Sequence, residues 1–354
     1  MSISRPFALR VLAAAALLTA GLASTAQAAK NLEWKFKEGE KLNYALRQSV
    51  GMLADFNGIE LDIKIKWTMD TAWTVKSIKS DGNAELVLTI ERLQLLLNTP
   101  FTGEFKYDSA DKENKPEGEV WERLGKPAEA MLKGEFALTV SKKGKVTDVK
   151  LPEDLVKALS EGGGGGGQAM MMGGGMFTES SIKQLFEQAV LPLPEEGVAD
   201  GVTWNKKLEN KMGPLGTQKI DVVFSYAGTE EKDGKVLEKI GAKTEVAFEP
   251  AEEGDLEIEM ELTEQEGTGE ILFDAEAGKT VKSSITQKLT MSGDFMGNEF
   301  EQETTLNLLL QAGSSDGLPS DEEESAEESA DSDSDSDADK KPEDEKKEDE
   351  KKDE

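Results

Sequence analysis

The clearest pattern in the chain is a long alternation of apolar and polar residues from Ile59 to Ile78. Apolar side chains occupy every odd position from Ile59 through Met69, with charged or polar residues between them. A period of two predicts a β-strand with one buried and one solvent-facing side. Because twenty residues exceed the length of an ordinary strand, a bend or bulge is expected near Thr71 or Ala72.

The same alternation continues on both sides of this stretch. A turn signal at Ser80–Asn83 leads into a second alternating run, which predicts a long antiparallel hairpin. The apolar phase of that second run slips by one residue near Arg92, as it does at a β-bulge. Residues 30–50 predict two strands around Glu38–Gly39, and residues 134–150 predict another hairpin.

The second part of the chain repeats this order of elements. Alternating runs occur at 220–226 and 256–262, and the last predicted hairpin spans 281–310. We therefore predict a mainly β fold, with long antiparallel hairpins in one or two curved sheets that form a half-barrel or a sandwich. Two related halves would flank a small two-helix insert.

Changes in composition divide the chain into five segments. Short amphipathic helices are predicted at 152–159 and 178–191, on either side of a glycine- and methionine-rich connection. The predicted segments are a signal peptide at 1–28, a first β half at 29–150, a helical and flexible insert at 151–194, a second β half at 195–312 and a disordered acidic tail at 313–354.

The N-terminal segment predicts export. An apolar run at 11–23 follows Arg5 and Arg10, and Ala26-Gln27-Ala28 provides the small residues of a cleavage site. The mature chain is therefore expected in the periplasm or outside the cell. No transmembrane segment is expected after cleavage of the signal.

The amino-acid composition limits the kinds of catalytic and metal-binding sites that the chain can form. The chain has no cysteine and no histidine, which excludes disulfides, thiolate sites and histidine-based catalysis. Its formal net charge of −30 argues against nucleic acid as a partner. The alternating aspartates from Asp331 to Asp339 lack the glycine and the final glutamate of an EF-hand loop. We predict no catalytic residue, no cofactor and no metal site.

The insert provides the residues that we single out. Four methionines and a phenylalanine follow a run of six glycines, and we interpret them as a lid over a ligand: Met170, Met171, Met172, Met176 and Phe177. The alternatives are a Cu(I) site or a solvent-exposed connection. Ser180 and Lys183 match the spacing of a Ser-x-x-Lys hydrolase, but the partner motifs are missing, and helix capping by Ser180 or Ser181 is the competing interpretation.

A set of short motifs carries a family resemblance. The Gly144–Val146 hairpin, helices at 155–159 and 182–191, and the Gly201–Trp204 strand start occur in this order. Over most of residues 30–311 the chain resembles an uncharacterised family of secreted bacterial domains of unknown function. More distantly it looks like the half-barrels that carry lipids or lipoproteins across the periplasm. Neither resemblance implies an activity or a functional residue.

These observations lead to three hypotheses of different classes. The first is an exported non-enzymatic protein that binds a small apolar ligand. The alternative is a structural or interaction protein of the cell envelope or surface, with an envelope protein as its partner. The third is a hydrolase that uses paired carboxylates, which 71 acidic residues would supply without pointing to any particular pair.

Overall fold

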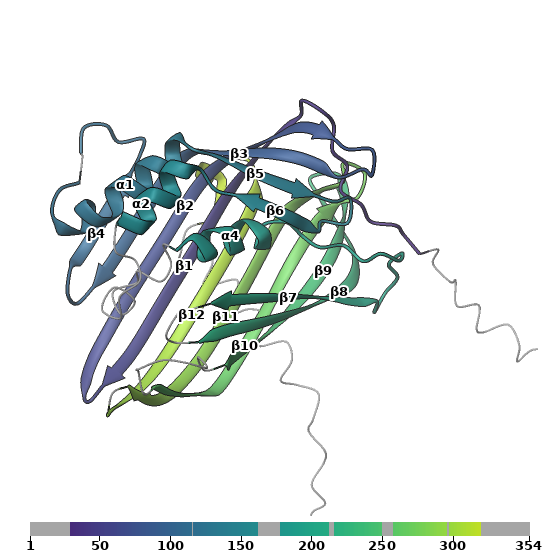
Figure 1. Cartoon of the computed structure of the whole chain (residues 1–354). Coiled ribbons are helices and arrows are strands. Elements are labelled where there is room, and N and C mark those ends of the chain that lie inside the picture. The colour runs from purple at the N-terminus through teal and green to yellow at the C-terminus, as the bar shows by residue number, and fades with distance from the viewer. Residues whose placement is uncertain are drawn as a thin grey trace, which may run out of the picture.

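The structure is a single curved sheet. The computed structural model describes residues 29–114, 116–161, 178–211, 216–249, 258–295 and 297–319. In these residues, twelve strands form one open antiparallel sheet that three α-helices cover on one side (Figure 1). The mainly β prediction is confirmed, and the choice between one and two sheets is settled as one. The predicted signal peptide and the lid residues 170–172, 176 and 177 lie outside the described residues.

The two halves of the chain form two contiguous blocks of strands. The first block contains β1 (Lys41–Phe56), β2 (Ile59–Ile78), β3 (Ala84–Thr99), β4 (Gly103–Asp108), β5 (Glu135–Val140) and β6 (Val146–Lys150). The second block contains β7 (Thr203–Lys211), β8 (Thr217–Lys232), β9 (Lys235–Glu249), β10 (Ile258–Asp274), β11 (Lys279–Phe295) and β12 (Asn298–Ala312). The first and last strands pair, so the sheet runs from β6 at one edge to β7 at the other.

One bulge explains both irregularities expected in the β2–β3 hairpin. Asp70 pairs with Arg92, whereas Thr71 pairs with Ile90, so Glu91 has no partner on β2. The extra residue shifts the apolar phase of β3 by one position and keeps its leucines on the buried face.

The N-terminal segment differs from its prediction. Residues 31–37 do not form a strand; they cross one end of the sheet and bond to several elements. The Trp34 N–H donates to Lys142, the Lys35 N–H donates to Gly278, and Lys30 pairs with Val198. The alternation of Trp34 and Phe36 suggested a strand, but these bonding partners come from different turns rather than from one neighbouring strand.

The helices also differ in number from the prediction. The sequence indicated two helices in the insert, and these are α2 (Glu153–Glu161) and α4 (Glu179–Gln188). A third helix, α1 (Glu119–Lys133), precedes them. The local sequence favours only a turn of helix over Pro127–Lys133, so α1 is far longer than that pattern predicts. Pro127 lies inside α1, a position that proline seldom takes because it removes one backbone hydrogen bond.

Helix α4 lies between the two edges of the sheet. It contacts both β6 and β7, and Phe186 of α4 packs on Phe136 of β5 with ring centroids 4.9 Å apart. The indole N–H of Trp204 on β7 donates to the Pro192 carbonyl just after α4. The curled sheet is therefore bridged by a helix where its two edges approach each other.

Candidate functional site

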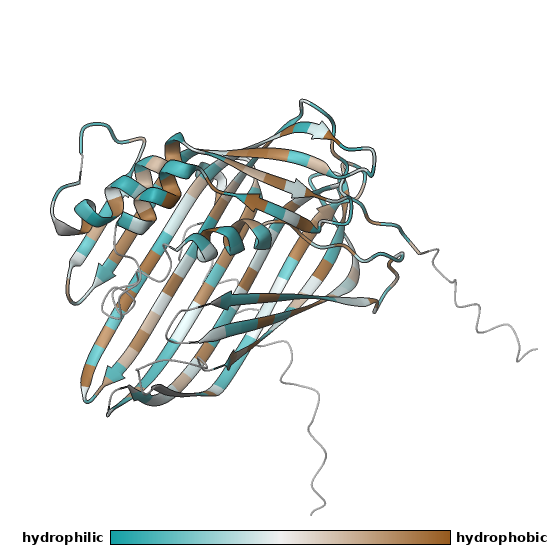
Figure 2. Ribbon diagram, viewed as in Figure 1, coloured by the Kyte–Doolittle hydropathy of each residue, from teal (hydrophilic) through white to brown (hydrophobic). Residues whose placement is uncertain are grey.

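The strands share one continuous inner face, which we define as the face toward the helices. Strand register carries it across the sheet: Leu46 on β1 pairs with Met69 on β2 and with Leu310 on β12. Figure 2 shows hydrophobic and hydrophilic residues alternating along the long strands. Because paired residues point to the same side, the odd positions of β2 and the even positions of β12 line one surface.

The inner face is fully packed at one end, which we call the Trp34 end. Trp34 stacks on Phe36 and meets Phe273 edge-on, and its indole N–H donates to the Leu191 carbonyl. Tyr44 and Trp73 pack against each other with centroids 5.1 Å apart. All of these except Phe36 are buried, so this end of the molecule is a solid core.

Farther from that end the inner face is less well covered. Several apolar side chains there are only partly buried, and we call them the apolar wall: Val50, Met52, Leu97, Phe248, Leu262, Ile285 and Leu306. Register links three of them, because Val50 pairs with Leu306 on one side and with Ile65 on the other, and Ile65 pairs with Leu97. A contiguous apolar surface of this kind in a concave sheet is the usual lining of a site for an apolar ligand.

One register row across the wall also carries polar groups. Lys206 on β7 pairs with Val222 on β8, which pairs with Thr244 on β9. Next to Thr244 is Gly267 of β10, which pairs with Gln287 of β11. A Cβ atom on Gly267 would lie 2.7 Å from the Thr244 Cβ, so the glycine leaves room for the threonine side chain.

Two of these polar side chains are buried without a hydrogen-bond partner among the described residues. They are the Thr244 hydroxyl and the Gln287 side-chain nitrogen, and both residues are less than 8% exposed. A buried donor without an acceptor costs about 1–3 kcal/mol. The interior therefore contains donors that an enclosed polar group would satisfy.

Lys206 is the charged member of the row. Its Nζ donates to the Glu187 carbonyl at the end of α4 over 2.7 Å. Burial lowers the pKa of this amine to about 8, although the Glu187 charge acts in the opposite direction. No carboxylate forms an ion pair with Lys206 among the residues that the structure describes. The cation is thus desolvated and only partly compensated.

Another charged residue on this face, Glu238, has its partners within the protein. Glu238 of β9 lies near the Trp34 end, where it accepts hydrogen bonds from Lys30 and from the Tyr226 hydroxyl. Burial, the hydrogen bond to Glu238 and the charge of Glu238 all raise the pKa of Tyr226. This cluster attaches the N-terminal segment to β9, and the charge of Glu238 is paired with the charge of Lys30.

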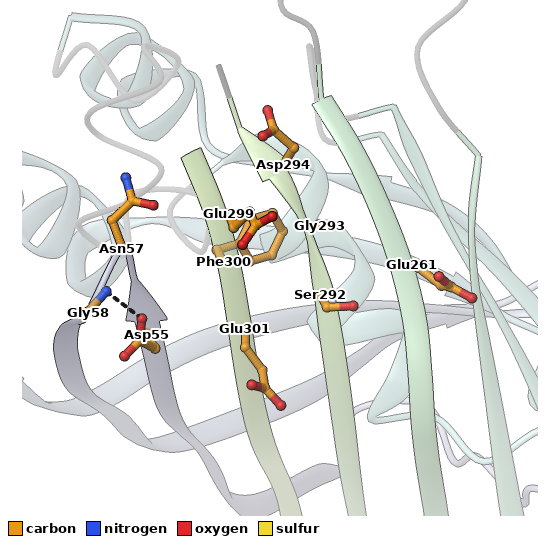
Figure 3. A pocket seen from close by; sticks show the side chains of 10 residues that line it. All are labelled: Asp55, Asn57, Gly58, Glu261, Ser292, Gly293, Asp294, Glu299, Phe300 and Glu301. Atoms are coloured by element: carbon orange, nitrogen blue, oxygen red, sulfur yellow. Dashed lines mark hydrogen bonds between the residues drawn. The ribbon is translucent and has the colours of Figure 1, made fainter. Parts of the chain in front are cut away.

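A second concave feature lies at the opposite end from Trp34, beside the tips of the β1–β2 and β11–β12 hairpins. It has a volume of about 810 Å³ and is lined by acidic side chains from four strands, among them Asp55, Glu261, Asp294, Glu299 and Glu301 (Figure 3). The Asp55 carboxylate accepts a hydrogen bond from the Gly58 N–H and so stabilises the turn between β1 and β2. Among the described residues, no group of three or more acidic side chains is arranged to hold a metal ion.

The predicted Ser-x-x-Lys motif has a local structural role. Thr178, rather than Ser180 or Ser181, caps α4 by accepting from the Ser181 N–H. Lys183 Nζ is 2.6 Å from a Glu179 carboxylate oxygen one turn earlier. The helix cap therefore comes from Thr178, just before the motif, and Lys183 of the motif contributes an i,i+4 ion pair.

Sequence reasoning missed the polar row and the acidic depression. The polar row depends on the register of five consecutive strands, and the acidic depression joins β1 to the distant strands β10, β11 and β12, so no local spacing marks either of them. The weak signal available was Lys206, a charged residue between Trp204 and Leu208 on the apolar phase of its strand.

Residues 81–298 match the model of DUF6263, a family of unknown function. The chain belongs to the DUF6263 family. The predicted resemblance to a family of unknown function is thereby confirmed. Family membership assigns no activity and no site residue. No curated protein matches the chain.

One solved structure with some similarity is that of lipovitellin, described for its lipid–protein interactions. It matches with a TM-score of 0.42 and 12% identity, and the match covers 81% of this chain and 27% of lipovitellin. The chain thus spans about a quarter of lipovitellin. A Bacteroides fragilis protein with a YMCC-like fold matches with a TM-score of 0.20 and 9% identity over 78% and 97% of the two chains. A DUF1329 family protein from Desulfovibrio piger matches with a TM-score of 0.14 and 10% identity over 78% and 87%. Within the described ranges, no helix has the length and apolarity needed to cross a membrane.

Proposed function

We propose that the protein is an exported, non-enzymatic binding module for a small apolar ligand. The observation that carries this proposal is the apolar wall, whose side chains stay partly exposed although they lie on the inner face of the sheet. Covering such a surface is favourable by roughly 25 cal/mol per Å² of apolar area removed from water. A ligand laid along the wall would supply that cover.

The first test is binding of the apolar fluorophore 1,6-diphenylhexatriene, together with native mass spectrometry after gentle extraction. We expect saturable, one-site binding and a co-purifying small molecule. Leu306→Gln should weaken binding of the fluorophore, because it places a polar amide in the apolar wall. The matched control is Leu53→Gln, on the outer face and 57% exposed, which should change nothing. A folded wild-type protein that binds no fluorophore and carries no ligand contradicts the proposal.

The connection at 162–177 supplies the lid in this proposal. Its methionines, Met170, Met171, Met172 and Met176, together with Phe177, are flexible apolar side chains suited to covering ligands of variable shape. Replacing residues 162–175 by a few glycines should leave the thermal midpoint unchanged, because loop closure depends only weakly on length. It should accelerate both uptake and release of the fluorophore in stopped-flow measurements. Unchanged rates would leave the segment as a plain connection.

A specific observation favours the second candidate, an interaction protein of the envelope. Leu53, Ile59 and Phe101 are each more than half exposed and lie at or near the hairpin tips far from Trp34. Exposed apolar side chains at hairpin tips suit contact with another protein. Crosslinking from a photoreactive residue at position 59 should capture one partner in the periplasm if this function holds. A matched probe at the outer-face position 64 should not.

A further inference from the structure

Among the residues that the structure describes, Lys206 is a cation of the inner face that forms no ion pair with a carboxylate. By strand register, the inner positions of β1, β2 and β12 carry only apolar or uncharged polar side chains over their described lengths. Glu238 is paired with Lys30 and Tyr226. Within the described part of the chain, the hydrogen-bond partner of Lys206 is a backbone carbonyl, that of Glu187. Such a cation in an apolar surrounding attracts a negative group that can reach it.

Lys206 is also placed where a ligand on the apolar wall would end. It lies on β7, the edge strand, beside the C-terminal end of α4, and its side chain is partly exposed. Its register row leads through Val222 to Thr244, whose buried hydroxyl bonds to none of the described residues, and on toward Gln287. The row therefore contains a cation and two donors, and all three favour an acceptor oxygen.

We propose that the apolar ligand is an acyl-chain amphiphile with an anionic head, and that Lys206 binds this head while Thr244 donates a hydrogen bond to it. This inference rests on the proposed function and specifies its ligand class. The acyl chain would lie along the apolar wall, and the head would lie at the β7 edge next to α4. The shared chemistry is an anionic oxygen, which either a fatty-acid carboxylate or a lipid phosphate can supply.

A pair of probes separates charge recognition from apolar binding. The fatty acid cis-parinaric acid and its methyl ester have the same fluorescent chain, but only the acid carries a charge. Wild-type protein should bind the acid at least tenfold more tightly than the ester, because only the acid can accept a charge-assisted hydrogen bond from Lys206. Binding of the ester alone would leave the proposed function standing and overturn this inference. Binding of neither probe would contradict the proposed function itself.

Variants then assign the preference to Lys206. Lys206→Met should lower affinity for the acid about tenfold and leave the ester within twofold, and Lys206→Arg should retain the preference. The matched control is Lys207→Met, the next residue, which points outward and pairs with Asp221. Thr244→Val should lower the affinity for the acid by a smaller factor than Lys206→Met does. If Lys206→Met lowers the affinities for the acid and for the ester equally, the lysine acts only by holding α4 against β7, and the inference is wrong.

Competition identifies the head group. Displacement of cis-parinaric acid from wild-type protein by oleate supports a carboxylate head, and stronger displacement by 1-oleoyl lysophosphatidate supports a phosphate head. In either case the competitor should lose its effectiveness against the Lys206→Met variant. Displacement that is equally strong in wild type and Lys206→Met overturns the assignment of the head to Lys206.

Discussion

Ile63 and Lys64 are neighbours on β2, but their side chains lie on opposite faces of the sheet. Ile63 is 1% exposed, whereas the Lys64 side chain is 60% exposed and pairs with Asp62. Ile63→Ala should lower the free energy of unfolding by about 2–5 kcal/mol, because it removes buried apolar atoms and leaves a cavity. Lys64→Ala should change it by no more than about 0.5 kcal/mol. Urea unfolding measures both, and equal losses would mean that β2 is buried on both faces.

A second residue-scale prediction concerns the pair of Arg92 and Asp108. Arg92 donates two hydrogen bonds to the Asp108 carboxylate, at 2.6 Å and 3.0 Å, and lowers the pKa of Asp108 to about 2. An unfolded aspartate titrates near pH 3.9, so the folded state favours the charged form. The pair therefore stabilises the protein fully above about pH 4, and the contribution is lost as the pH falls through 2.

Asp108→Asn should show this dependence directly. The variant should be less stable than wild type at pH 6, and the gap should close as the pH falls from 4 toward 2. Chemical denaturation at several pH values gives the comparison, with Asp62→Asn as an exposed control that should cost little. A stability gap that stays constant down to pH 2 would contradict the assigned role of the ion pair.

At the scale of elements, the short turn Ser315–Gly317 fastens the end of the described chain to the outer face of the sheet. The Ser315 N–H and hydroxyl donate to the Asp70 carboxylate, and Arg92 pairs with Asp316. Arg47 donates to the Pro319 carbonyl. These contacts place the first residues of the predicted tail against β1, β2 and β3.

Two truncations test the boundary of the folded part. Removing residues 320–354 should leave the thermal midpoint unchanged, because that stretch has very few apolar residues to bury. Removing 313–354 should lower the midpoint by several degrees, because Asp70 then loses its hydrogen bonds from Ser315 and Arg47 loses its bond to the Pro319 carbonyl. Calorimetry distinguishes the two cases. Equal midpoints for both truncations would show that the Ser315–Gly317 turn contributes nothing to stability.

At the scale of the whole molecule, α4 bridges the two edges of the curled sheet. Phe186 is fully buried against Phe136, and substitution by alanine should cost about 3–5 kcal/mol. Because α4 contacts both β6 and β7, its loosening should also expose the interior. Phe186→Ala should therefore bind the dye ANS more strongly at temperatures below unfolding. Phe101→Ala, which is 60% exposed, is the control; equal dye binding in both variants would show that α4 does not close the sheet.

The fold class and most strands could be predicted because their causes are local. A few neighbouring residues are enough to cause each of these features. Examples are the alternation in β2, the phase slip at Glu91 and the turn between β11 and β12, where Gly297 has a positive φ. The same local reasoning failed for Trp34 and Pro127. The backbone N–H of Trp34 bonds to Lys142 in a remote turn, and Pro127 lies inside α1, a helix whose Trp121 packs on Tyr107 of β4.

The sequence by itself determined the long hairpins, their buried faces, the absence of thiol and imidazole chemistry, and the expectation of export. The tertiary structure decided that all strands form one sheet, that α4 spans its two edges, and that Lys206, Thr244 and Gln287 share one register row. The reason is physical. Alternation fixes which side of a strand is buried, but only long-range pairing, such as that of β1 with β12, fixes which strands are neighbours and which polar groups meet inside.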